Sequence, residues 1–162
     1  MFADTLLWEA RALLAAARSK DIHIVTAESC TGGLIAALLT EIPGSSEVVE
    51  RGFVTYSNQA KEDLLGVSAQ TLSVHGAVSE PVCRAMAEGA LKQSRAQLAV
   101  AVTGIAGPGG GSAEKPVGLV FIAAARTAGD VIVREYRFGD IGRDRVRLGT
   151  VEKAVQLLRD CV

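Results

Sequence analysis

The sequence contains few histidines and cysteines and has almost no excess charge. Of its 162 residues two are histidine and three are cysteine, and 17 basic against 18 acidic side chains leave a formal net charge of -1. A chain this close to neutral lacks the overall positive field that holds nucleic acid or an anionic membrane. Cys30, Cys83 and Cys161 are odd in number and too far apart in sequence for a local metal-ligand pair. We therefore expect reduced thiols, no metal site and no nucleic-acid partner.

Long hydrophobic runs are also missing. The apolar stretches reach only about ten residues, against roughly 20 needed to span a bilayer, and the N-terminus has no basic segment followed by an apolar run. The composition is otherwise globular, with 49% apolar residues, 17 glycines and 4 prolines. These features predict a cytoplasmic protein without a membrane partner, folded as a single domain over residues 1–162.

Helical and strand-like segments alternate along the chain. Apolar residues follow helical spacing from Leu6, from Leu34 and again after Gly142, and Ser79-Glu80-Pro81 is a typical helix start. Strand-like runs cover residues 22–26, 52–56, 98–103, 117–125 and 131–138, and the last two are separated by a connection of hairpin length. The pattern predicts an α/β fold, a three-layer α/β/α sandwich with a mixed, mostly parallel sheet.

Three unusual segments each follow a predicted strand. They are residues 28–33, 56–61 and 103–112, and Asn58 is well suited to cap a short helix that carries Lys61. In open α/β sheets ligands bind beyond the carboxyl ends of the strands. We therefore expect the three segments to converge on one pocket.

Ser29 is the candidate nucleophile. It lies in Glu28-Ser29-Cys30-Thr31-Gly32-Gly33, between a strand and a helix, where free backbone N–H groups can bind a phosphate or a developing oxyanion. The alternative reading is that Ser29 or Thr31 only caps the helix. Cys30 is a rival nucleophile, although a thiol there is equally often an inert buried group.

A nucleophilic serine needs a base, and histidine is scarce. A lysine whose pKa is lowered by burial can fill this role, which makes Lys61 the candidate. Tyr56 lies about one helical turn before it and can donate a hydrogen bond or relay a proton. The alternative is a solvated Lys61 beside a half-buried Tyr56, because sequence spacing alone fixes no geometry.

Two further features indicate anion binding. Five of the nine residues in segment 104–112 are glycine, but neither G-K-[ST] nor G-x-G-x-x-G is present, so the loop is an anion nest or a flexible connection and does not imply ATP or a dinucleotide. Arg143, Arg145 and Arg147 lie in the first turn of the last helix, where the macrodipole disfavours cations. Either Asp140 and Asp144 or a ligand phosphate offsets that charge.

Five short motifs in a fixed order resemble the CinA C-terminal domain family over nearly the whole chain. The motifs are Thr26-Ala27-Glu28-Ser29-Cys30-Thr31-Gly32-Gly33, Tyr56-Ser57-Asn58 with Lys61, Gly76-Ala77-Val78-Ser79-Glu80, Thr103-Gly104-Ile105-Ala106-Gly107-Pro108 and Lys115-Pro116-Val117-Gly118. Longer relatives carry an N-terminal domain resembling molybdopterin-binding proteins, so this chain looks like a stand-alone form. The resemblance also implies a homodimer or a higher homo-oligomer.

The resemblance implies a reaction, because the enzymatic members of the family are nicotinamide mononucleotide amidohydrolases. It implies conversion of that nucleotide substrate to nicotinic acid mononucleotide and ammonia, without a cofactor or a metal. Ser29 would attack the amide carbon, Lys61 would take its proton and Tyr56 would assist. Predicted substrate-binding residues are Glu28, Cys30, Thr31, Gly32, Thr103, Gly104 and Arg143.

Two points stay open in the sequence. Segment 138–143 holds one residue more than the family's usual pattern, which leaves open whether Arg143, Arg145 or Arg147 reaches the ligand. The alternatives to this amidohydrolase are a nucleotide-binding module without turnover and a deamidase of another small amide.

Overall fold

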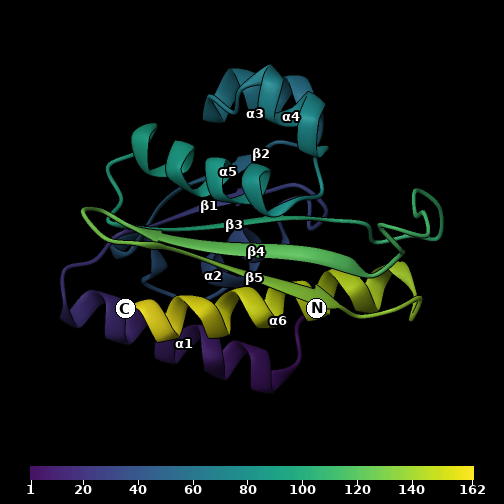
Figure 1. The fold of residues 1–162 in the computed structure, drawn as a ribbon. Coiled ribbons are helices and arrows are strands. Elements are labelled where there is room, and N and C mark those ends of the chain that lie inside the picture. The colour runs from purple at the N-terminus through teal and green to yellow at the C-terminus, as the bar shows by residue number, and fades with distance from the viewer.

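The computed structural model describes all residues 1–162 and shows helices on both faces of one five-stranded sheet (Figure 1). The strands are β1 (Ile24–Glu28), β2 (Val49–Val54), β3 (Leu98–Gly104), β4 (Leu119–Arg126) and β5 (Val131–Arg137). The helices are α1 (Asp4–Ser19), α2 (Leu34–Thr40), the 3-10 turn η1 (Ser45–Glu47), α3 (Asn58–Leu65), α4 (Ala69–His75), α5 (Glu80–Lys92) and α6 (Arg143–Cys161). The predicted α/β/α sandwich is confirmed.

The sheet is mixed, with strand order β2-β1-β3-β4-β5. β1 pairs in parallel with both β2 and β3, whereas β4 is antiparallel to β3 and to β5. Four of the five strands therefore run in the same direction, and β4 and β5 form the predicted antiparallel hairpin. Every residue of β1 is buried, as expected of a parallel strand covered on both faces.

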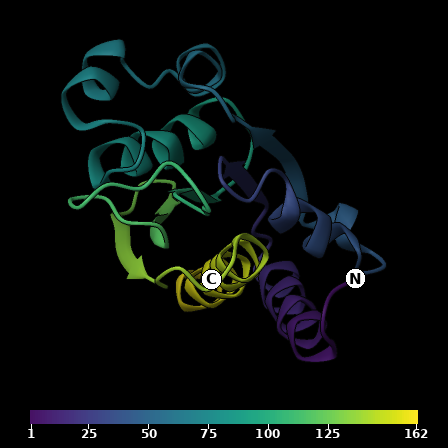
Figure 2. The same cartoon turned by 90° about the vertical axis from the view of Figure 1, so that its right-hand side faces the viewer.

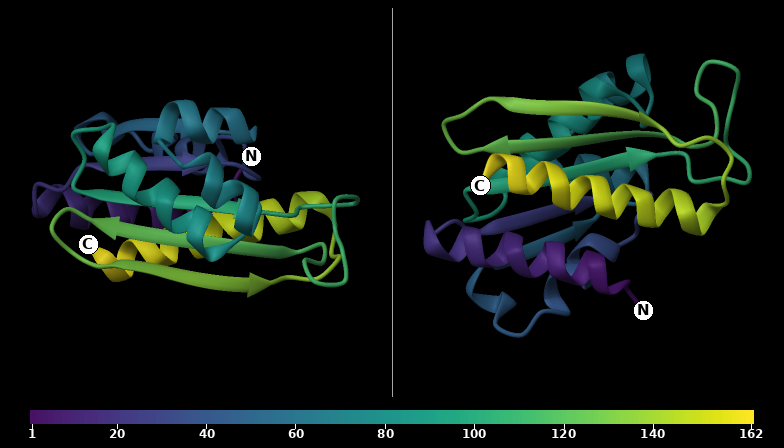
Figure 3. Two further views of the ribbon diagram at one scale, coloured as in Figure 1. Left: turned by 45° about the horizontal axis from the view of Figure 1, so that its top comes forward. Right: turned by 90° about the horizontal axis from the view of Figure 1, so that it is seen from below.

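Two hydrophobic cores lie on opposite faces of the sheet. Alternate residues of β3 divide between them, Leu98, Val100 and Val102 in one core and Ala99 and Ala101 in the other. The first core packs under α1, α2 and α6, and α1 and α6 lie side by side beneath the sheet in the right-hand view of Figure 3. The second core packs under α3, α4 and α5.

The carboxyl ends of the three parallel strands are level with one another. Glu28 at the end of β1 is in register with Val54 of β2 and with Val102 of β3. Figure 2 looks toward this end of the sheet, where the long loop after β3 and the start of α6 also lie. The segments that follow these strands are therefore close in space although they are far apart in sequence.

Two local predictions need correction. Ser57, and not Asn58, caps α3, because its side chain accepts a hydrogen bond from the N–H of Ala60. The helix α4, which ends at His75, is absent from the segments that the sequence predicts as helical. This seven-residue helix buries only Leu72, and so short and polar a segment shows no helical period in the sequence.

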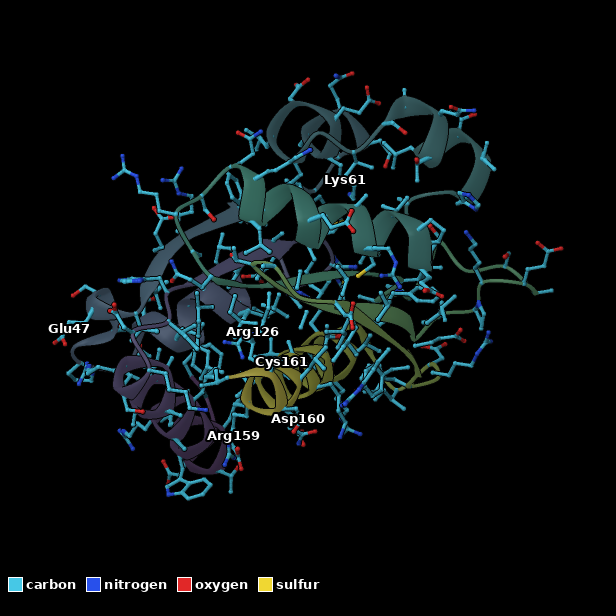
Figure 4. The ribbon with its side chains drawn as sticks, turned by 60° about the vertical axis from the view of Figure 1, so that its left-hand side comes forward. Glu47, Lys61, Arg126, Arg159, Asp160 and Cys161 are labelled. Carbon is cyan, nitrogen blue, oxygen red and sulfur yellow. The ribbon has the colours of Figure 1, made fainter.

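Far from the carboxyl ends of the parallel strands, polar contacts join the end of α6 to β4 and β5 (Figure 4). Arg126 at the end of β4 donates a 3.0 Å hydrogen bond to the carbonyl oxygen of Cys161, and Arg134 of β5 pairs with Asp160 at 3.2 Å. Lys61 lies on the other side of the sheet from these C-terminal residues of α6. None of the six helices is long and apolar enough to cross a membrane.

Candidate active site

Ser29 lies in the turn between β1 and α2. Its backbone N–H donates to the carbonyl oxygen of Val102 at 3.1 Å, which ties the turn to the neighbouring strand β3. The turn then bends sharply, because Gly32 has a φ of +58° and Gly33 a φ of +100°. Residues with a Cβ rarely adopt these backbone conformations. The residue as a whole is 9% exposed.

Lys61 extends from the first turn of α3 into the protein and meets Ser29. Its side chain is 1% exposed, and its Nζ lies 3.1 Å from the Oγ of Ser29 and 2.9 Å from the carbonyl oxygen of Thr55. Burial lowers the pKa of the Lys61 amine below its usual 10.5, because the charged form loses water. The structure thus brings together the serine and the lysine that the sequence singled out, and the lysine is not solvated.

Cys30 is a poor rival to Ser29. Burial raises the pKa of its thiol to about 12, although the Arg147 and Lys61 charges oppose that shift. A thiolate is the reactive form of cysteine, so at neutral pH this side chain is almost entirely the unreactive thiol.

The serine and lysine open onto a pocket of 220 Å³ at the carboxyl ends of the strands. The pocket is lined by Ser29, Cys30, Tyr56, Asn58, Lys61, Ala77, Val78, Thr103, Gly104, Ala106 and Arg143. All three segments expected to converge contribute to it. Nowhere in the chain do three or more His, Cys, Asp or Glu side chains gather as a metal site requires.

Three predicted binding residues do not line the pocket. The fully buried carboxylate of Glu28 accepts hydrogen bonds from the hydroxyl of Thr31 at 2.6 Å and from the backbone N–H groups of Gly33, Ile35 and Ala36 at 2.9–3.1 Å. Glu28 and Thr31 therefore hold the turn onto the start of α2, and Gly32 shapes it. Their contact with a substrate stays a prediction.

The three arginines of α6 have different surroundings. Arg143 lines the pocket and donates hydrogen bonds to the Tyr56 hydroxyl at 2.8 Å and to the carbonyl oxygen of Gly107 at 2.9 Å. Arg147 points at the serine-bearing turn, and Arg145 makes no hydrogen bond and lies against a groove between α1 and α6. Tyr56 is 61% exposed, and its hydroxyl makes no hydrogen bond with Ser29 or Lys61.

Thr103 and Gly104 form the floor of the pocket. The buried hydroxyl of Thr103 donates to the carbonyl oxygen of Ala77 at 2.9 Å, which holds the segment before α5 against the end of β3. A side chain at Gly104 would collide with Leu119 and Val120 of β4. Sequence reasoning did not predict four lining residues, Asn58, Ala77, Val78 and Ala106, although all four stand within the motifs quoted above. The last three have apolar side chains, and the polar Asn58 was interpreted as a helix cap.

Fold and pocket together define a three-layer α/β/α protein with a serine–lysine pair at the carboxyl ends of its parallel strands. The chain belongs to the CinA C-terminal domain family, whose model matches residues 9–162. It is 54% identical over 144 residues to nicotinamide-nucleotide amidohydrolase PncC of Escherichia coli K12, covering 88% of this chain and 86% of that protein.

One further relative is much longer than this chain, whereas a solved structure matches this chain over nearly its full length. The chain is 52% identical over 141 residues to a CinA-like protein of Syntrophobacter fumaroxidans, an alignment that covers 87% of this chain but only 33% of that protein. The crystal structure of competence/damage inducible protein CihA from Agrobacterium tumefaciens superposes with a TM-score of 0.96 at 56% identity, covering 98% of this chain and 96% of that one.

Proposed function

We propose that this chain hydrolyses the carboxamide of nicotinamide mononucleotide to nicotinic acid mononucleotide and ammonia. The observation that carries the proposal is the 3.1 Å contact between Lys61 Nζ and Ser29 Oγ inside the pocket. The 54% identity to nicotinamide-nucleotide amidohydrolase PncC, over most of both chains, supports the substrate.

Ser29 is the nucleophile in this reaction. Its Oγ attacks the carboxamide carbon, and Lys61 Nζ takes the hydroxyl proton. A lysine can accept a proton only in its neutral form, and burial favours that form. The hydrogen bond to the carbonyl oxygen of Thr55 keeps the amine beside Ser29 in either protonation state.

The negative charge that develops on the amide oxygen needs hydrogen-bond donors. The backbone N–H groups of Cys30 and Thr31 follow the nucleophile directly, and neither donates to an oxygen of the protein. The N–H of Ser29 itself is engaged with Val102. Of the two residues only Cys30 lines the pocket, so we assign the oxyanion to the N–H of Cys30, since a preorganised donor of this kind stabilises a tetrahedral intermediate strongly.

The leaving group and the water complete the cycle. The tetrahedral intermediate collapses, the C–N bond breaks, and the proton held on Lys61 passes to the departing nitrogen, which leaves as ammonia. The nicotinoyl group is then an ester on Ser29. A water molecule, deprotonated by Lys61, attacks this ester and releases the carboxylate and the free serine, so one water is consumed for each ammonia.

The pocket suits one end of a small molecule. Its 220 Å³ lies below the roughly 300–1,000 Å³ of typical ligand pockets, so an aromatic amide enters while the remaining substrate lies at the opening. Arg143, held by Tyr56 and Gly107, is the pocket's exposed cation, and its planar fork suits a phosphate. Arg143 is therefore the phosphate-binding arginine of this proposal, with Thr103 and Gly104 against the ring.

The test is ammonia release from nicotinamide mononucleotide by the purified protein without added metal. Ser29→Ala should remove turnover, whereas Ser46→Ala, at an exposed serine of η1, should leave it unchanged. Binding without ammonia release would instead identify a nucleotide-binding module. Release from another small amide, but not from this nucleotide, would identify a different deamidase.

A further inference from the structure

Arg147 reaches from α6 to the turn that carries Ser29. Its Nε donates to the carbonyl oxygen of Cys30 at 3.1 Å, and its Nη2 donates to the carbonyl oxygen of Thr31 at 2.9 Å. One half-buried guanidinium thus holds two consecutive carbonyl groups immediately after the nucleophile. The planar fork of arginine fixes the directions of both bonds, which a lysine ammonium does not.

Holding a carbonyl oxygen also orients the N–H group of the same peptide unit. All peptide bonds in this turn are trans, so the C=O and N–H of each unit point in opposite directions. The bond from Arg147 to the Cys30 carbonyl therefore directs the N–H of Thr31 away from the guanidinium. That N–H finds no acceptor oxygen in the protein, but Thr31 is fully buried and does not line the pocket, so this N–H does not face a substrate.

The second bond acts through one more link. The carbonyl oxygen of Thr31 is held by Arg147, and the N–H of the same peptide unit, on Gly32, donates to the carbonyl oxygen of Ser29 at 3.0 Å. This carbonyl shares its peptide unit with the N–H of Cys30, which is consequently directed away from Gly32 and is also without an acceptor oxygen. The directions of both free N–H groups thus depend on Arg147.

We propose that Arg147 is a positioning residue that, through Gly32 and the Ser29 carbonyl, aims the N–H group of Cys30, which lines the pocket, at the oxyanion of the tetrahedral intermediate. The inference rests on the proposed function, because it names the device that stabilises the charge formed when Ser29 attacks. Arg147 touches neither the substrate nor the reacting atoms. Its removal lowers kcat and leaves KM nearly unchanged, since the Cys30 donor is used most strongly in the transition state.

The kinetic test compares Arg147→Gln and Arg147→Lys with Arg145→Gln, the matched control at an exposed arginine of the same helix that makes no hydrogen bond. Arg147→Gln should lower kcat about 10- to 100-fold, below the roughly 10²–10³-fold cost of deleting an oxyanion donor outright, because the Cys30 N–H remains but loses its alignment. Arg147→Lys, which keeps the charge and can still donate to one of the two carbonyl groups, should recover part of the loss. Arg145→Gln should match the wild type.

A second readout separates this inference from the choice of substrate. Diisopropyl fluorophosphate labels a reactive serine by forming a P–O bond as fluoride leaves, with the serine proton passing to Lys61, and it uses the same oxyanion donor. Arg147→Gln should slow the labelling of Ser29. The dissociation constant of the product nicotinic acid mononucleotide should change by about twofold at most, which is well under the roughly 1.4 kcal/mol that a tenfold change represents. The pH at which labelling is half-maximal should not move, because Lys61 is untouched.

Each result has a defined meaning. If the wild type is labelled at Ser29 but releases no ammonia, the proposed function is wrong. The labelling rates of the wild type and Arg147→Gln then test the role of Arg147 on their own. Normal kcat and normal labelling in folded Arg147→Gln overturn the positioning role, as does a rise in KM without a fall in kcat. If Arg147→Gln does not fold, the same criteria apply to Arg147→Lys, for which a slowed labelling rate with normal product binding supports the proposal.

Discussion

Lys61 donates a 2.9 Å hydrogen bond to the main-chain carbonyl of Thr55, six residues before it and just beyond the end of β2. This bond anchors a buried amine without any carboxylate, and burial outweighs Cys30, the group that raises the pKa of Lys61. Burial without a carboxylate partner lowers the pKa of the amine. The contact therefore joins the two requirements of a general base, a fixed position beside Ser29 and a lowered pKa.

Activity should rise with pH until Lys61 is neutral. Because the pKa of Lys61 lies below 10.5, kcat/KM for ammonia release should rise through an inflection below that value and then level off. Lys61→Met should lower kcat by about 10²–10⁴-fold, the usual contribution of a general base. The exposed Lys92→Met is the matched control and should keep the wild-type profile. A flat pH profile in the wild type would contradict Lys61 as the base.

The same residue should make the stability of the protein depend on pH. The unfolded chain holds its Lys61 proton up to about 10.5, but the folded chain loses it at a lower pH, so the unfolded state binds more protons between the two values. The free energy of unfolding therefore rises with pH across that window. In Lys61→Met this increase should be absent, so the free energy of unfolding of the variant relative to the wild type should fall as pH rises through that window. Urea unfolding at several pH values measures this, and parallel curves for both proteins would refute it.

Replacing Cys30 should leave the reaction intact. Burial raises the pKa of the thiol to about 12, so almost no thiolate is present at neutral pH. Cys30→Ala should keep kcat within about threefold, a difference worth less than 1.4 kcal/mol. Ammonia release and iodoacetamide sensitivity are the two measurements. If Cys30→Ala removes turnover and Ser29→Ala does not, the nucleophile has been assigned to the wrong residue.

Much of the fold follows from local sequence signals. The buried run of β3, the hairpin of β4 and β5 and the proline-led start of α5 all depend on neighbours in sequence. The short α4 was missed because a single buried leucine leaves no period to detect. At the site, the residue types pointed to Ser29 and Lys61, but the 3.1 Å contact between them depends on the register of β1 with β2.

Some contacts at the site lie beyond any local signal. The bonds from Arg147 to the carbonyl groups of Cys30 and Thr31 span more than 110 residues of chain. Three arginines at neighbouring positions of one helix look alike in sequence. Only the packing of α6 against the sheet decides that Arg143 lines the pocket, that Arg147 meets the turn and that Arg145 faces α1.

Tyr56→Phe should separate two possible roles of Tyr56. The hydroxyl accepts the 2.8 Å bond from Arg143 and makes none to Lys61, so its removal should free the guanidinium without disturbing the base. KM should rise about three- to tenfold, or about 0.7–1.4 kcal/mol, the net worth of one hydrogen bond at an exposed site, with kcat nearly unchanged. Steady-state kinetics measure both constants. A fall in kcat of the size expected for Lys61→Met would show instead that Tyr56 relays the proton.

Glu28→Gln should destabilise the turn that carries the nucleophile. The carboxylate accepts four hydrogen bonds without exposure to water, and an amide in its place turns one acceptor into a donor that faces other donors. The unmatched groups should cost about 2 kcal/mol, a fall in Tm of about 4–8 °C for a chain of this size. Glu88→Gln, at an exposed position of α5 with no hydrogen bond, is the control and should leave Tm unchanged. Because the same turn presents Ser29 and the free N–H of Cys30, folded Glu28→Gln should also lose kcat. Normal Tm and normal kcat together would mean that the turn is held by Arg147 and the sheet alone.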